Sequence, residues 1–306
     1  MDREEIRHHL KGPVTSIHTP FNRDGSIDYN GLRTLIDTCI GNGSKTMILT
    51  AGDSHFLCLS DAEIAELTKV TVEHSAGRAM VISADRYHST QRAVEFAKFC
   101  REVGADVHIS MPPDWAESCT VDTLAEHYAE VAKVLPLMII TNIFGIVGQR
   151  GGQFGLDAIR LSMEKSANIV AIKDDTGDTF AQRMCLMVHE RCVVMAGGQK
   201  QTHLNILPFG CESYMSTYLQ FYPEITRRYW AAIGAGDLET AWRIAREYDQ
   251  AFFQFLSCLR GGWNAGLHGT FELFGICQRW RRKPYYSLND EEMETIGDFF
   301  RRLSIL

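Results

Sequence analysis

Short apolar runs recur eight times along the first two-thirds of the chain, and this recurrence constrains the fold more than any other feature of the sequence. The runs span residues 14–17, 46–49, 79–83, 107–111, 137–140, 169–172, 193–196 and 213–216. Several of them are apolar on successive residues instead of alternate residues. Such runs are typical of parallel strands that are buried on both faces of a sheet.

Helical signals occupy most of the segments between these runs. Ser60 and Glu63 form a capping-box pattern ahead of apolar residues at helical spacing, and a second helix is predicted from near Thr90 to Gly104. Eight strand–helix units in series predict a closed (β/α)8 barrel. An open, doubly wound sheet is the competing architecture, but no glycine fingerprint follows the first predicted strand.

The strand signal fades after Phe221, and helical patterns follow over residues 223–233 and 238–256. We therefore predict a barrel over residues 1–219 and a C-terminal helical extension over residues 220–306 that packs on the barrel or on a neighbouring subunit. The extension carries aromatic residues at the spacing of a helical core face, namely Trp230, Trp242, Tyr248, Phe252 and Phe253. Because one barrel face does not readily cover so much apolar surface, these helices also favour a homo-oligomer.

Composition narrows the possible partners and compartment. The 306 residues carry a formal net charge of −7, which gives no reason to expect nucleic acid or an anionic membrane as a partner. The dense basic run at residues 279–283 is interpreted as a solvated helix end. Nine cysteines without a CxxC pair indicate reduced thiols, and the lack of a signal peptide or membrane-spanning run adds to the prediction of a cytoplasmic protein.

Polar residues close several of the predicted strands, at the end of a barrel where active sites are built. Among them, Lys173 directly follows the apolar run 169–172, which places an amine where the barrel interior meets its mouth. An amine that attacks a carbonyl must be neutral, so its pKa must fall from about 10.4 through burial or a cationic neighbour. The competing interpretation is a lysine that reaches out of the barrel and pairs with Asp174 or Asp175.

The segment from Ile169 to Asp178, IVAIKDDTGD, resembles the Schiff-base segment of the dihydrodipicolinate synthase and N-acetylneuraminate lyase family. Residues 13–21, the glycine turn at residues 50–54 and Gly197 resemble further pieces of that family in the same order. The resemblance therefore covers nearly the whole chain, and the lysine segment is its most specific part.

This resemblance implies a (β/α)8 barrel, an imine between Lys173 and a 2-keto acid substrate, and a homotetramer. It also implies that Thr50, the Ala51 amide and Gly197 bind the carboxylate of the keto acid, since backbone N–H groups in a turn suit an anion.

Three departures set this chain apart from the family pattern. The family has a proton-relaying tyrosine at the end of the fifth strand, and Thr141 stands in its place here. A threonine hydroxyl donates a hydrogen bond but is a poor proton shuttle. Ile146 replaces the arginine that the synthase branch uses for a distal carboxylate, and residues 112–115 replace a Tyr-Tyr segment. These differences argue against dihydrodipicolinate synthase itself, and Ile146 with Trp115 suggests a less acidic distal group.

Two hypotheses follow for the function. The first is an aldolase or dehydratase that acts on pyruvate or a sugar-derived 2-keto acid, with Lys173 and Thr141 as catalytic residues. The second is a barrel that binds such an acid without turning it over, because the proton relay is lost. Eleven histidines show no metal-ligand spacing, so neither a metal nor a cofactor is predicted. His55 and Asp85 are candidate substitutes for the missing acid or base, although the favoured interpretation of each is a loop residue that forms hydrogen bonds.

Overall fold

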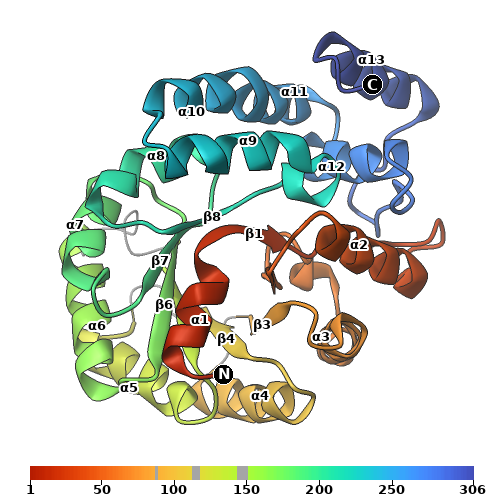
Figure 1. The fold of residues 1–306 in the computed structure, drawn as a ribbon. Helices are drawn as coiled ribbons and strands as arrows, with labels where there is room; N and C mark the ends of the chain where they lie inside the picture. The colour runs from red at the N-terminus through yellow and green to blue at the C-terminus, as the bar shows by residue number, and fades with distance from the viewer. Residues whose placement is uncertain (87–88, 112–117, 143–150) are drawn as a thin grey trace.

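The computed structural model describes residues 1–86, 89–111, 118–142 and 151–306. Eight parallel strands pair in chain order and close into a barrel, in which β1 pairs with β8 (Figure 1). The strands are β1 (Gly12–Ser16), β2 (Thr46–Ile48), β3 (Met80–Ala84), β4 (Val107–Ser110), β5 (Leu137–Ile140), β6 (Ile169–Asp174), β7 (Val193–Ala196) and β8 (Ser213–Met215). Each strand overlaps one of the eight predicted runs, so the predicted (β/α)8 barrel is confirmed.

Helices cover the outside of this barrel (Figure 1). One helix, α1 (Arg3–Leu10), precedes the first strand. The connections between strands carry α2 (Tyr29–Gly41), α3 (Asp61–Ser75), α4 (Thr90–Glu102), α5 (Val121–Ala132), α6 (Gly151–Lys165), α7 (Thr179–Val188) and α8 (Lys200–Ile206).

The burial of the strands explains why their apolar runs do not alternate. Every residue of β2 through β7 is buried, because one face of each strand packs inside the barrel and the other packs under the helices. A polar side chain on such a strand has few positions where it meets water. The carboxyl end of the barrel is the place where polar residues collect.

Local signals determine where the helices begin and end. The Ser60 hydroxyl accepts a hydrogen bond from the Glu63 amide, and the Glu63 carboxylate accepts one from the Ser60 amide, which confirms the predicted capping box of α3. The predicted helix from Thr90 is also confirmed, since α4 ends at Glu102 and Gly104 follows with a φ of 93°. Glycine adopts this left-handed conformation without steric cost.

The C-terminal part of the chain is helical, as predicted. It comprises α9 (Pro223–Gly234), α10 (Leu238–Ile244), a π-helical turn (Ala245–Gln250), α11 (Ala251–Cys258), α12 (Gly262–Leu273) and α13 (Asp290–Arg302). The helix α9 lies beside the barrel near α8, and α13 lies farthest from the strands (Figure 1). Phe252 is buried with its ring 5.3 Å from that of Tyr218, whereas Phe253 stacks on Trp263 at 3.8 Å. The aromatic residues of this region therefore pack on one another and on the barrel.

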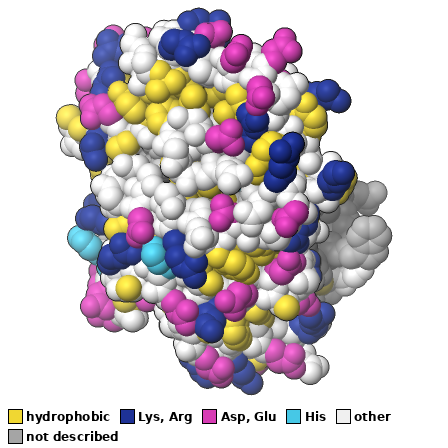
Figure 2. Space-filling model, turned by 90° about the vertical axis from the view of Figure 1, so that its right-hand side faces the viewer, with side chains coloured by type: hydrophobic (Ala, Val, Ile, Leu, Met, Phe, Trp, Pro, Cys, Tyr) yellow, Lys and Arg dark blue, Asp and Glu magenta, His cyan; other side chains and the backbone are white. Residues whose placement is uncertain are grey.

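The basic run at residues 279–283 is not a solvated helix end, and that interpretation is wrong. The run lies in the loop between α12 and α13, and the Arg281 side chain is buried with only 6% of its surface exposed. The loop folds back onto the barrel instead of extending into solvent. Elsewhere the charges are dispersed, and Figure 2 shows a face on which acidic and basic side chains are interspersed around hydrophobic patches.

Two further observations concern the environment of the protein. None of the described helices is both long enough and apolar enough to cross a bilayer. All nine cysteines are free thiols, and five of them are buried, namely Cys39, Cys100, Cys185, Cys192 and Cys211.

A buried ion pair joins the barrel to the C-terminal helices. The Lys200 ammonium at the start of α8 contacts the Asp249 carboxylate in the π-helical turn, and Asp249 also accepts a hydrogen bond of 2.9 Å from the Lys200 amide. Three tyrosine rings surround the ammonium with centroids 5.2 to 5.8 Å away, those of Tyr214, Tyr218 and Tyr229. Such a pair is costly to break from one side, because the remaining charge stays buried without a partner.

We therefore expect Asp249→Leu to lower the free energy of unfolding by about 3–5 kcal/mol in urea titrations, because Lys200 is left unpaired. The double variant Lys200→Met with Asp249→Leu removes both charges and is expected to recover most of that loss. Glu164→Gln, which breaks an exposed pair with Arg160, is the control and should change the free energy by less than about 1 kcal/mol. Equal losses in the single and double variants would contradict this account.

Candidate active site

A cavity of about 360 Å³ opens at the carboxyl end of the barrel. Its polar lining comes from the ends of β2, β5, β6 and β7, and consists of Thr50, Gly52, Asp53, Asn142, Lys173 and Asp175 with Gly197 and Gly198. Its apolar lining consists of Ala51, Leu57, Met111, Ile140 and Met215. The cavity thus joins strand ends from around the barrel, at the position where barrel enzymes bind their substrates.

Lys173 lines this cavity. The backbone register places it between Ile140 on β5 and Met195 on β7, and only 5% of its surface is exposed. Its ammonium forms an ion pair and hydrogen bond with the Asp175 carboxylate, which also lines the cavity. The lysine does pair with Asp175, as the competing interpretation holds, but it does so within the cavity and not outside the barrel.

Gly197 leaves the space that this ion pair occupies. A Cβ atom at position 197 would lie 1.8 Å from the Asp175 carboxylate and 2.5 Å from the Lys173 amine. The Gly197 amide donates a hydrogen bond of 2.7 Å to the Asp174 carbonyl, which fixes the backbone at this point. A residue with a side chain would therefore displace the lysine, the aspartate or both.

Asp174 faces the other side of β6 and is held by its neighbours. Its buried carboxylate accepts hydrogen bonds from the Thr141 hydroxyl at 2.7 Å and from the Gly177 amide at 2.8 Å. Burial raises the pKa of Asp174, and the hydrogen bond from Thr141 opposes that rise. The Thr141 hydroxyl is thus directed to Asp174, and Thr141 does not line the cavity; its contact with a substrate stays a prediction.

The turn after β2 lines the cavity with Thr50, Ala51, Gly52 and Asp53. The Thr50 amide donates to the Ser54 hydroxyl at 3.1 Å, and that hydroxyl donates to the Ile17 carbonyl at 2.5 Å, so the turn is fixed to β1. The Ala51 and Gly52 amides donate to no other described residue. Two free N–H groups on a fixed turn are suited to binding a carboxylate.

Neither substitute acid or base suggested by the sequence lines this cavity. Asp85 is buried, accepts a hydrogen bond of 3.1 Å from the Met111 amide, and lies 3.5 Å from the His108 Nε2 atom. His55 packs against His268, with 3.1 Å between their Nε2 atoms. Both residues support the strand ends and loops around the cavity. The predicted distal contacts at Trp115 and Ile146 lie outside the described residues.

Asp175 is the cavity residue whose role the sequence analysis missed. It was considered only as a partner that would draw Lys173 out of the barrel. The signal was present in the spacing, because residues two apart at the end of a strand face the same side. Lys173 and Asp175 satisfy that rule at the mouth of the barrel.

A buried amine beside a carboxylate, opposite a turn with free amides at the mouth of a parallel barrel, defines a lyase of the class I aldolase type. Comparison with known proteins identifies the family to which the chain belongs. Residues 9–302 match the model of the dihydrodipicolinate synthetase family, and the chain belongs to that family.

Individual relatives agree with this assignment. The chain is 26% identical over 237 residues to the 4-hydroxy-tetrahydrodipicolinate synthase of Dechloromonas aromatica, which covers 77% of this chain and 79% of the relative. It is 26% identical over 303 residues to a probable 5-dehydro-4-deoxyglucarate dehydratase of Streptomyces coelicolor, covering 96% and 93%. The crystal structure of an N-acetylneuraminate lyase from Mycoplasma synoviae superposes with a TM-score of 0.82 at 20% identity, covering 96% and 97%, which shows the shared fold.

The Asp85–His108 contact makes stability depend on pH. Burial alone would lower the pKa of His108, but the Asp85 carboxylate, with Cys100, raises it to about 9 from an ordinary value of 6.5. A raised pKa in the folded state means that the stabilisation is complete below pH 6.5 and is lost as the pH rises through 9. We expect a loss of up to about 3 kcal/mol in the free energy of unfolding over this range, measured by urea titration.

The control for this prediction is His108→Gln, in which the imidazole is absent. The variant is expected to be less stable at pH 6 and to lack the His108-dependent fall between pH 6.5 and 9. The account would be contradicted by a variant whose stability falls over this range as steeply as that of the unmodified protein.

Proposed function

We propose that the protein cleaves or dehydrates a sugar-derived 2-keto acid, or acts on pyruvate, through an imine formed on Lys173. The observation that carries this proposal is the ion pair between the buried Lys173 amine and the Asp175 carboxylate. The same cavity is lined by Ala51 and Gly52, whose amides donate to no other described residue. This arrangement supplies a nucleophile, a proton acceptor and a carboxylate site within the length of a small substrate.

Asp175 takes the role of the proton carrier in this mechanism. Its carboxylate accepts a proton from the Lys173 ammonium, and the neutral amine then attacks the C2 carbonyl carbon of the keto acid. Asp175 returns the proton to the hydroxyl of the resulting carbinolamine, which leaves as water when the C=N bond forms. In the protonated imine, the nitrogen accepts an electron pair from C3. Dehydration begins when Asp175 takes a proton from C3, and the resulting enamine expels the C4 hydroxyl as water after Asp175 returns that proton. Cleavage begins when Asp175 takes the proton of the C4 hydroxyl, so that the C3–C4 bond breaks and the distal part leaves as an aldehyde. In this proposal the Asp175 carboxylate, which forms a hydrogen bond with the Lys173 amine, carries the proton that a tyrosine carries in the family pattern.

The lining of the cavity suggests how the substrate lies. Its carboxylate contacts the Ala51 amide and Thr50, with Gly197 close to C2, and the remaining carbons extend toward Asn142 and Met215. Lys173 is the one cationic side chain among the described residues of the lining, so a distal carboxylate finds no second cation there. A neutral, hydroxyl-bearing distal part fits this lining better. The Streptomyces coelicolor relative is named as a dehydratase, which supports loss of water as the reaction.

In this proposal Thr141 acts through Asp174. Its hydroxyl holds the Asp174 carboxylate at 2.7 Å, which keeps the end of β6 in place beside the cavity. Thr141 is therefore a positioning residue for Lys173. The alternative function, binding without turnover, predicts an imine on Lys173 with no product release.

We also propose that the protein assembles as a homo-oligomer, most simply a tetramer, in the cytoplasm. The rings of Phe253, Phe255 and Trp263 lie on the C-terminal helices and are only partly buried in one chain, which supports a further interface there. Nine free thiols support a reducing compartment.

Lys173→Ala is expected to reduce turnover on a panel of 2-keto acids to the level of a control without enzyme, because no other amine lines the described cavity. Product formation is measured with pyruvate plus aldehydes and with sugar-derived 2-keto acids. Little condensation of pyruvate with aspartate semialdehyde is expected in the unmodified protein. Substantial turnover by a folded Lys173→Ala variant would contradict the proposal, and an imine without any turnover would support the alternative.

Gly197→Ala tests the geometry of the site without removing a charge. The added methyl group clashes with Asp175 and Lys173, and a displacement of about 1 Å lowers turnover by roughly 10²-fold. Gly41→Ala is the matched control, because a Cβ atom there meets no atom within 4 Å. Both variants should keep their circular dichroism spectra, and unchanged turnover in Gly197→Ala would show that the pair is not part of the site.

A further inference from the structure

A second and larger cavity lies outside the active site, between the α12–α13 loop and the loop that follows β1. Its volume is about 850 Å³, and its lining includes Arg23, Trp280, Arg281, Lys283, Tyr285 and Tyr286. We call this cavity the loop pocket. None of its lining residues lines the active-site cavity.

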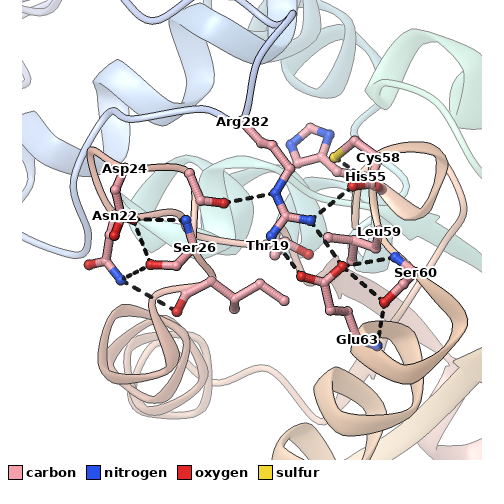
Figure 3. A network of polar contacts seen from close by, with 12 residues as sticks. Thr19, Asn22, Asp24, Ser26, His55, Cys58, Leu59, Ser60, Glu63 and Arg282 are labelled. Carbon is pink, nitrogen blue, oxygen red and sulfur yellow. Dashed lines mark hydrogen bonds and ion pairs between the residues drawn. The ribbon is translucent and has the colours of Figure 1, made fainter.

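Arg282 fixes the loop that forms this pocket. Its guanidinium makes two hydrogen bonds to the Glu63 carboxylate, at 2.7 and 3.0 Å, and donates to the Gly25 and Cys58 carbonyls (Figure 3). The Glu63 carboxylate stays ionised, because the hydrogen bonds from Arg282 lower its pKa to about 2. The hydrogen bonds between Arg282 and Glu63 of α3 therefore hold the wall of the pocket in place.

The other cations of the pocket lack such partners. Within the described ranges, no carboxylate lies at ion-pair distance from Arg23, Arg281 or Lys283. The acidic residue of the lining is Asp24, whose carboxylate accepts hydrogen bonds from the Ser26 hydroxyl and amide. Unpaired positive charge thus dominates the pocket.

Among these cations, Arg281 gives the strongest indication that the pocket binds an anion. Only 6% of its surface is exposed, its Nε atom has no hydrogen-bond partner among the described residues, and its guanidinium stacks over the Tyr285 ring at 5.0 Å. Burial lowers its pKa to about 10, so the group stays charged at neutral pH. A buried guanidinium without a carboxylate is costly, and an anion from solution would remove that cost.

The histidines behind Arg281 favour an anion over a metal ion. One ring nitrogen from each of His18, His55 and His268 lies within 4.8 Å of the others, which by distance alone would suit a cation. However, the Arg281 guanidinium lies 3.4 Å from the His55 ring, and a divalent cation there would face an unpaired positive charge. Burial lowers the pKa of each of these imidazoles, so they are neutral, and none of the three lines the loop pocket.

We propose that the loop pocket binds a small phosphate ester, with Arg281 as the principal partner of the phosphate and Arg23 and Lys283 as supporting charges. Guanidinium and phosphate pair through two parallel hydrogen bonds. The volume of the pocket exceeds the needs of a phosphate group, and the Trp280 and Tyr286 rings give the organic part of the ester apolar surface. This chemistry is shared by nucleotides and sugar phosphates.

The test is calorimetric titration of the full-length protein with AMP, ribose 5-phosphate and inorganic phosphate, with adenosine as the uncharged control. We expect at least one of the two esters to bind saturably at one site per chain, and we expect no binding of adenosine. AMP binding alone would assign the site to nucleotides, whereas equal binding of both esters would assign it to sugar phosphates more generally. No saturation by any of the three phosphates at millimolar concentration would overturn the proposal.

Variants locate the bound anion. Arg281→Met should weaken binding roughly tenfold or more, and the exposed Lys283→Gln, which removes no packing, should weaken it about threefold. Arg279→Gln is the matched control from the same loop, since Arg279 pairs with Glu272 and Asp290 and does not line the pocket. Unchanged affinity in both Arg281→Met and Lys283→Gln would overturn the proposal. So would binding that is lost in Lys173→Ala, because the anion would then occupy the active site.

Discussion

The ion pair between Lys173 and Asp175 is the interaction on which the account of this protein depends. It exists because β6 is buried on both faces, so that the amine emerges only where the strand reaches the mouth of the barrel. Gly197 on the neighbouring strand end leaves room for the pair, and Asp174 is held on the opposite face by Thr141. A barrel with any side chain at position 197 would need to place its lysine elsewhere.

The fold and the position of the lysine were accessible from sequence because both follow from burial along a strand. Parallel strands covered on two faces are apolar at successive positions, and eight such runs in series leave few architectures other than a closed barrel. A lysine directly after one of these runs has nowhere to lie but the mouth. The capping box at Ser60 and Glu63 was predictable for a similar reason, since it depends on residues three apart.

The features that the sequence did not reveal depend on contacts between distant segments. Which face of β5 Thr141 occupies is set by its register with β6, and a shift of one residue exchanges the two faces. The burial of Arg281 arises because the α12–α13 loop folds onto residues near Gly25 and Glu63, more than 200 positions away in the sequence. A run of basic residues carries no local signal for such a contact, so the simpler interpretation as a solvated helix end was wrong.

The most direct test of the central claim is to locate the imine itself. The protein is incubated with isotopically labelled pyruvate and borohydride, digested, and analysed by mass spectrometry for the modified peptide. Our account predicts one reduced adduct, on Lys173, with Lys200 unmodified because its ammonium is enclosed by Asp249 and three tyrosine rings. An adduct on another lysine with Lys173 unmodified, or no adduct with pyruvate or any sugar-derived 2-keto acid, would contradict it.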